Sequence, residues 1–361
     1  MRYLEEFDRY RIVLHVLRCF MHLTVPFMVI PSQIWPFKSE FSHNETADGF
    51  VFIVHVGIME AFFLLNGFFA MQLLERKTTK QFVLNRVRRI VVPFVLGIVV
   101  MVPIILTLGL SKKNKVPLLE SFPLLKSFLA EHPINFGPYW SLWYLILLYV
   151  LFLVLEINFQ FFSKRIKQLK FSVMLGLVLL FASTSLFFFF RKYTLLPIDT
   201  LLDWQMILYY FSIFSFGVWI YFHQDIIERI KKVYVIAILT IIAFAINVWF
   251  QKTEHPSTVF RIIGVFCYVF QSLGLAVLVF EWIKKWKFGS VEKNKTLSQS
   301  MYWLYWIEVP IAIAIHYFFL DSVHPLIIVL GGGIFTFSVS IISFKLLLNN
   351  KFLGKLLGFS N

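Results

Sequence analysis

The chain has 361 residues, of which 59% are hydrophobic and only 15% are charged. A soluble domain carries about a quarter charged residues, so this composition excludes an ordinary soluble protein. The formal net charge of +14 would suit a nucleic-acid ligand, but the placement of the charges described below gives no reason to expect that partner.

The apolar residues are grouped in runs of about 20, the length that an α-helix needs to cross the hydrocarbon core of a bilayer. The runs cover approximately residues 11–31, 50–72, 90–110, 137–157, 171–190, 203–222, 233–250, 259–281, 298–319 and 325–347. We therefore predict an all-α polytopic membrane protein, a bundle of about ten transmembrane helices that forms one domain over residues 1–361.

Lysine and arginine are distributed unevenly between the two sides of this bundle. With the N-terminus inside, 24 of the 34 Lys and Arg residues fall in cytoplasmic segments. This asymmetry follows the positive-inside rule and predicts that both termini are cytoplasmic. The basic segments are then topology signals and contacts for anionic membrane lipids, and no nucleic acid is expected.

The first apolar run carries a stripe of polar residues. Successive members are three, four, three and four residues apart, a spacing that places them all on one helical face. They are Asp8, Arg11, His15, Arg18 and His22. The stripe extends about 16 Å from Arg11 to His22, from one membrane surface to near the midplane.

Two explanations account for such a costly row of charges. Polar membrane residues often join helices by hydrogen bonds. Alternatively, Arg11 near the cytoplasmic end binds a phosphate or carboxylate with its guanidinium fork, and a neutral His22 deeper in takes a proton from a hydroxyl.

Further polar residues lie in the second run and in the connector that follows it. Glu60 is an intramembrane carboxyl, either catalytic or the counter-ion of an arginine of the first run. Gly67 permits close approach of a ligand or another backbone. In the connector, Arg86 and Arg89 share a helical face and are either cytoplasmic flanking charges or, with Arg18, part of a basic site for a nucleotide phosphate.

Glu308, in the ninth run, is a second mid-membrane carboxyl, and we expect a functional role for it. No pair of histidines has convincing metal spacing, so we expect no metal. The two cysteines, Cys19 and Cys267, lie inside apolar runs and are expected to be buried rather than bridged.

The motifs, taken in order, resemble the membrane acyltransferase-3 family, and within it the glucan-modifying branch of glucans biosynthesis protein C. The first span of the family begins with Asp-x-x-Arg and reaches a His after ten further residues, as at Asp8, Arg11 and His22. The other matching segments are Phe62–Phe68, Arg86–Pro93, Ser141–Leu145, Phe214–Gly217 and Ser298–Pro310. The chain departs from the pattern where Asn66 replaces Ser, and where Ser141 and Glu308 each replace His.

The resemblance implies an O-acyltransferase of the bacterial inner membrane. It would move an acyl group, acetyl or succinyl, from cytoplasmic acyl-CoA to a hydroxyl of an envelope carbohydrate or glycolipid such as a periplasmic glucan. His22 would be the base or acyl relay and Arg11 its anion-binding partner. Acyl-CoA is then the donor substrate, and no permanently bound cofactor is expected.

A transporter or flippase for an anionic lipid or sugar is the alternative, since it too would use a polar stripe. Matched broken spans in two halves of the chain, the usual sign of a transporter, are missing from the sequence. An acyltransferase needs one histidine whose loss stops turnover, whereas a transporter moves its substrate without acyl change. A non-catalytic scaffold gives no reason for five polar residues on one face.

Overall fold

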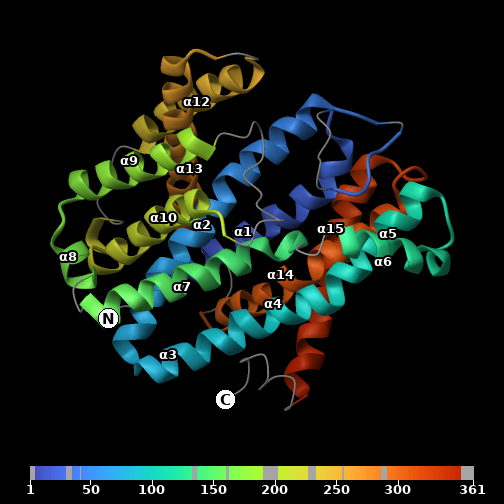
Figure 1. The fold of residues 1–361 in the computed structure, drawn as a ribbon, viewed down its shortest axis with the longest axis horizontal. Coiled ribbons are helices and arrows are strands. Elements are labelled where there is room, and N and C mark those ends of the chain that lie inside the picture. Colours follow the sequence, from blue (N-terminus) through green and yellow to red (C-terminus); the bar gives the residue numbers. More distant parts are fainter. Residues whose placement is uncertain are drawn as a thin grey trace. The chain divides into compact units, whose positions relative to one another are not determined.

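The computed structural model of the chain is built from helices (Figure 1). It describes residues 5–29, 35–40, 42–131, 136–159, 162–189, 202–226, 233–253, 256–285 and 291–350. No β-strand occurs within these ranges, which confirms the predicted all-α class. Residues 30–31 and 190 of two predicted runs, and the two chain termini, lie outside the described residues.

The chain divides into two compact units, each built from separate stretches of sequence. The first unit contains Met1–His55, Asn85–Tyr139 and Phe288–Asn361. The second contains Val56–Leu84 and Trp140–Lys287.

In the first unit, three long helices pack together. They are α1 (Glu5–Thr24), α14 (Val291–Phe319) and α15 (Pro325–Asn349), and α1 contacts both of the others (Figure 1). The remaining helical segments that lie in this unit are η1 (Val25–Phe27), η2 (Val87–Val91), α4 (Val92–Leu96), η3 (Gly97–Met101), α5 (Val102–Asn114), η4 (Leu118–Ser121), α6 (Phe122–Glu131) and η5 (Gly137–Tyr139). The helix α14 also packs against α5.

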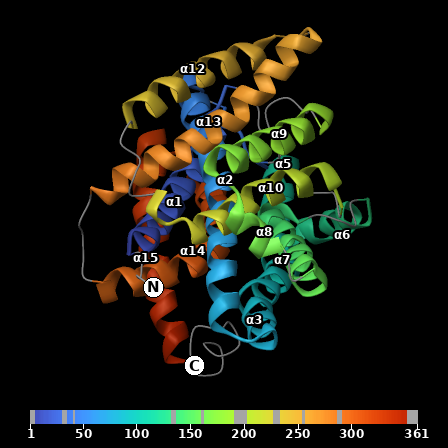
Figure 2. The same cartoon turned by 90° about the vertical axis from the view of Figure 1, so that its left-hand side faces the viewer.

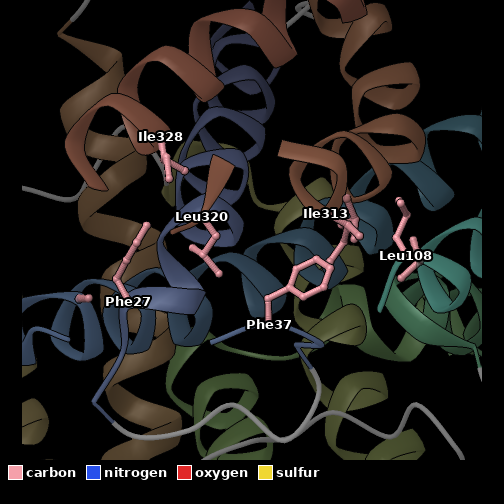
Figure 3. Packing of buried hydrophobic residues seen from close by; sticks show 9 residues of the cluster. Phe27, Phe37, Leu108, Ile313, Leu320 and Ile328 are labelled. Atoms are coloured by element: carbon pink, nitrogen blue, oxygen red, sulfur yellow. The ribbon is translucent and has the colours of Figure 1, made fainter. Parts of the chain in front are cut away.

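An apolar cluster joins the ends of these helices. Figure 3 shows Phe37 of the segment after η1 directed toward Ile313 of α14, with Leu108 of α5 beside them. Phe27, Leu320 and Ile328 belong to the same cluster. Burial of this apolar surface holds the connection after α1 against α14 and α5.

The stretch from residue 79 to residue 114 is a continuous helical run with two π-helical segments, η2 and η3. Each is followed by an α-helix with a proline in its first turn, Pro93 in α4 and Pro103 in α5. Proline lacks an N–H and clashes with the preceding turn, so a wider turn before it accommodates the break. Arg88 and Arg89 lie in the first of these segments.

The second unit contains the helices of the middle of the chain. Its elements are α7 (Trp140–Phe159), α8 (Phe162–Gln168), α9 (Phe171–Phe189), α10 (Trp204–Phe222), α12 (Val233–Lys252) and α13 (Thr258–Lys284). The helix α2 (Glu45–Arg76) passes from the first unit into the second, and α3 (Thr79–Arg86) returns. Within this unit α12 lies along α13, and α9 packs against both α10 and α13 (Figure 2).

Two glycines allow α2 and α10 to cross closely. A Cβ atom at Gly67 would overlap the backbone carbonyl of Phe214, and one at Gly217 would overlap that of Leu64. The close approach expected at Gly67 is therefore confirmed, and its partner is a protein backbone.

Seven helical segments of the described chain are long and apolar enough to cross a membrane, and the sharply bent pair α8 and α9 would make an eighth. These seven or eight segments correspond to most of the roughly ten transmembrane helices that the sequence predicts. The predicted runs that fail this test are α1 and α14, which carry charged and polar residues at the positions described next. The chain is a multi-pass α-helical membrane protein.

Candidate functional site

The helices α1 and α14 present matching polar stripes to one another. The residues of α14 that meet α1 are four, three and three residues apart: Ser298, Tyr302, Tyr305 and Glu308. Arg11 meets the start of this series and His22 meets its end. The two helices therefore run in the same direction, with their stripes in register.

At the start of the stripes, Arg11 is held by two side chains. Its Nη1 donates to Ser298 Oγ at 2.8 Å and lies 3.5 Å from Asp8 Oδ1. The Ser298 hydroxyl in turn donates to Asp8 Oδ1 at 2.7 Å. The guanidinium of Arg11 also lies over the Tyr302 ring, 5.1 Å from its centroid. These contacts fix the direction in which the guanidinium points.

The basic connector approaches this end of the stripes. Arg86, Arg89 and Arg11 are all close enough to Tyr302 for their charges to act on its hydroxyl. The structure thus brings together three of the arginines for which a phosphate-binding role is predicted. Three arginine charges that act on one tyrosine make this end of the stripes cationic, which is suited to phosphate oxygens.

At the other end of the stripes, the end that contains His22 and is called the deep end below, one carboxylate oxygen contacts two residues of α1. His22 Nδ1 lies 2.9 Å from Glu308 Oε1, and Arg18 Nε lies 2.7 Å from the same oxygen. Glu308 is 1% exposed and Arg18 is 7% exposed. A buried carboxylate oxygen accepts hydrogen bonds, so we assign the Nδ1 proton to His22, which leaves its Nε2 lone pair available.

The sequence left open whether Glu60 is the counter-ion of an arginine of α1. In the structure, the carboxylate paired with Arg18 is Glu308. Glu60 lies in the second unit, where its Oε1 accepts a hydrogen bond of 2.6 Å from Tyr209 of α10. The role of Glu60 toward an arginine of α1 stays a prediction, and within its own unit Glu60 is bonded to Tyr209.

Three polar atoms of Arg18 and Glu308 are buried and lack a hydrogen-bond partner among the described residues: Arg18 Nε, Arg18 Nη2 and Glu308 Oε2. Arg18 Nε is in an ion pair with Glu308 Oε1, so in the described part of the chain Arg18 Nη2 and Glu308 Oε2 are the two that have no partner of either kind. The guanidinium of Arg18 is also stacked on Tyr305, with its Cζ 3.8 Å from the ring centroid. Unsatisfied buried polar atoms are costly and rare, and a donor and an acceptor of this kind beside His22 mark a place where a ligand can bind.

The remaining predicted residues are placed as follows. His15 is buried and meets the edge of the Tyr305 ring, with 6.1 Å between centroids. Ser141 is buried near the start of α7 in the second unit. Cys19 and Cys267 are both buried and free. In the part of the chain that is described, no group of three or more His, Cys, Asp or Glu residues is arranged to hold a metal.

The sequence analysis did not single out Ser298, Tyr302 and Tyr305 as site residues. Together with Glu308, these residues are three or four apart in α14, as the residues of the α1 stripe are in α1. This spacing is the sequence signal that could have identified them as one helical face. Tyrosine and serine in a membrane helix are common, so the period alone did not distinguish them from residues of an aromatic belt.

Comparison with known protein families identifies the family of this chain. The acyltransferase domain model of the acyltransferase-3 family matches residues 4–345, which include segments of both units. The chain belongs to this family, and it is a membrane acyltransferase. Comparisons with curated proteins and with solved structures find no match for the chain.

Proposed function

We propose that this enzyme transfers an acyl group from acyl-CoA to a hydroxyl of an envelope carbohydrate, with His22 as the base. The observation that carries the proposal is the contact of the partly exposed His22 with the buried ion pair of Glu308 and Arg18. The same helix positions Arg11 eleven residues earlier, about 16 Å away. A single helix thus offers an anion-binding end and a proton-accepting end.

The arginines around Tyr302 would hold the donor. CoA carries phosphates at one end of a long flexible arm and the thioester at the other. With its phosphates on Arg11, Arg86 and Arg89, the arm would lie along the stripe and present the thioester near His22. In this arrangement, the binding energy of the phosphates positions the thioester, although the phosphates lie far from the reacting bond.

The proton chemistry follows from the contacts of His22. With Nδ1 directed at Glu308, Nε2 accepts the proton of the acceptor hydroxyl as its oxygen attacks the thioester carbon. The carboxylate of Glu308 stabilises the imidazolium that results. When the carbon–sulfur bond breaks, the CoA thiolate takes this proton, and His22 returns to its neutral state. This sequence is a direct transfer; an acyl group carried by His22 would use the same residues.

Arg18 would stabilise the charge that develops on the thioester oxygen. Its Nη2 is buried one helical turn from His22 and makes no hydrogen bond within the described chain. A fixed cationic donor in a water-poor site is effective against an oxyanion, and removal of one such donor typically costs about 10²–10³ in rate.

The acceptor is inferred from the resemblance of the motifs to the glucan-modifying branch. A periplasmic glucan with succinyl as the acyl group fits that branch, and the enzyme would lie in the bacterial inner membrane. The test is mass spectrometry of envelope glycans and lipids from cells with and without the gene. Loss of an acetyl or succinyl mass would identify donor and acceptor together, whereas unchanged envelopes would contradict the proposal.

Neutralising the arginines near Tyr302 is expected to weaken donor binding. Arg11→Ala, Arg86→Ala and Arg89→Ala should each lower the affinity for CoA roughly tenfold, because each removes a charge-assisted hydrogen bond to phosphate. Binding of CoA to the parent should also weaken as salt is added, since contacts at a wet surface are screened. Titration calorimetry with CoA measures both effects.

Lys126→Ala is the control for these variants, because Lys126 is an exposed cation of α6 that we expect on the outer side. It should bind CoA as the parent does. Unchanged affinity in Arg11→Ala would remove the donor-binding role from Arg11.

Orientation in the membrane gives a separate prediction. In intact cells whose outer membrane has been permeabilised, Lys38→Cys and Lys126→Cys should react with an impermeant thiol reagent, and Lys80→Cys should not. The native thiols Cys19 and Cys267 are buried, so their background is low. Labelling of Lys80→Cys under these conditions would show that the proposed orientation is inverted.

A further inference from the structure

An aromatic side chain from the segment after α1 covers His22. The indole of Trp35 is stacked on the imidazole, with 5.5 Å between ring centroids and 20° between the planes. Trp35 is half-buried and packs against the apolar cluster of Cys19, Leu23 and Ala312. It therefore contacts residues of both α1 and α14.

A second histidine holds this indole in place. Trp35 Nε1 lies 3.2 Å from His316 Nδ1, and His316 Nε2 lies 3.2 Å from the carbonyl oxygen of Leu23. An indole N–H only donates and a carbonyl only accepts. His316 must therefore accept at Nδ1 and donate at Nε2, which assigns it one neutral tautomer.

The segment that carries Trp35 is itself fixed to the first unit. The amide of Ser39 donates to the carbonyl of Pro26 at 3.0 Å. Phe37 is buried in the cluster shown in Figure 3. Pro36 lies so close to Gly109 of α5 that a Cβ there would meet its ring at 2.8 Å. These contacts give the indole a defined position over His22.

We propose that Trp35 and His316 are positioning residues for the acyl-transfer step. The hydrogen bond to Glu308 holds the His22 ring at one atom, Nδ1, and leaves it free to tilt about that contact. The stacked indole removes the tilt, and His316 fixes the indole. The free Nε2 is then held in one direction, toward the place where the acceptor hydroxyl must lie. This inference rests on the proposed role of His22.

The test compares variants that keep or remove the stack. Trp35→Phe keeps an aromatic ring over His22, and Trp35→Leu does not. Misplacing a catalytic group by about 1 Å costs up to about 10² in rate. We therefore expect kcat to fall 10- to 100-fold in Trp35→Leu and less than about fivefold in Trp35→Phe. KM for acyl-CoA should stay within about twofold in both, since the donor phosphates bind elsewhere.

The assay uses full-length protein in membranes of a strain that lacks the gene, with radiolabelled acetyl-CoA or succinyl-CoA as donor. Trp303 is the matched control, because its indole N–H also bonds to a side chain, Ser343, at 2.7 Å. Trp303→Phe and Trp303→Leu should transfer label as the parent does. Equal activity in Trp35→Leu and Trp303→Leu would overturn the proposal, as would a change confined to KM.

His316 provides a second and independent pair of variants, which decides the question if Trp35→Leu does not accumulate. The amide of His316→Gln can accept from Trp35 and donate to Leu23, whereas His316→Leu can do neither. We expect the kcat of His316→Gln to be at least about tenfold higher than that of His316→Leu. Equal kcat in the two variants would refute the role of His316. Loss of transfer in His22→Ala with normal transfer in Trp35→Leu would leave the proposed function intact and reject only the positioning role.

Discussion

Replacing His22 with alanine is expected to abolish acyl transfer while leaving the protein folded and able to bind CoA. His22 is partly exposed, with 18% of its side chain accessible, so its removal leaves a small gap rather than a large core cavity. Loss of an acid–base group typically lowers the rate by about 10²–10⁴. Loss of a covalent relay would lower it further. Envelope mass spectrometry and label transfer from acyl-CoA both measure this outcome.

His15→Ala is the matched control, since His15 lies two turns earlier on the same helix. It is buried against Tyr305, and the contacts with Glu308 are made by His22 and Arg18. We expect it to retain measurable activity. Full acylation by His22→Ala would require that the mechanism and the site on α1 both be abandoned.

The stripe of α1 was predictable because helical periodicity depends only on sequence spacing. Residues three and four apart share a face in any α-helix, and Arg11, Arg18 and His22 do meet the same neighbour, α14. Glu308 was singled out from its position in an apolar run, and it is buried in the structure. Gly67 was predicted to allow a close approach, and it does so.

The partner of each polar residue was not predictable in the same way. Only Glu60 was considered as a counter-ion for an arginine of the first run, whereas the structure pairs Arg18 with Glu308. This pairing depends on α14 lying beside α1, and a hydropathy pattern does not contain the order of helices in space. Trp35 was also missed, because a residue in a connection has no period that shows which side chain it covers.

The final prediction concerns the buried ion pair of Arg18 and Glu308. Glu308→Ala removes the carboxylate and leaves the Arg18 guanidinium buried without a counter-ion. Breaking a buried pair by removing one partner typically lowers the free energy of unfolding by about 3–5 kcal/mol. We therefore expect Glu308→Ala to lose thermal stability in detergent and, because His22 also loses its hydrogen bond, to lose acyl transfer.

The double variant Arg18→Met/Glu308→Ala separates these two effects. It contains no unpaired buried charge, so most of the lost stability should return. Transfer should stay absent, because His22 still lacks its carboxylate partner and the Arg18 donor is gone. Recovery of transfer in the double variant would show that Glu308 acts only through stability and that Arg18 is not needed for the reaction. If Glu308→Ala were as stable as the parent, the Arg18 charge would have to be solvated or paired elsewhere. In that case the deep end of the stripe would be a wet cavity, and the oxyanion role of Arg18 would lose the low-polarity surroundings that make it effective.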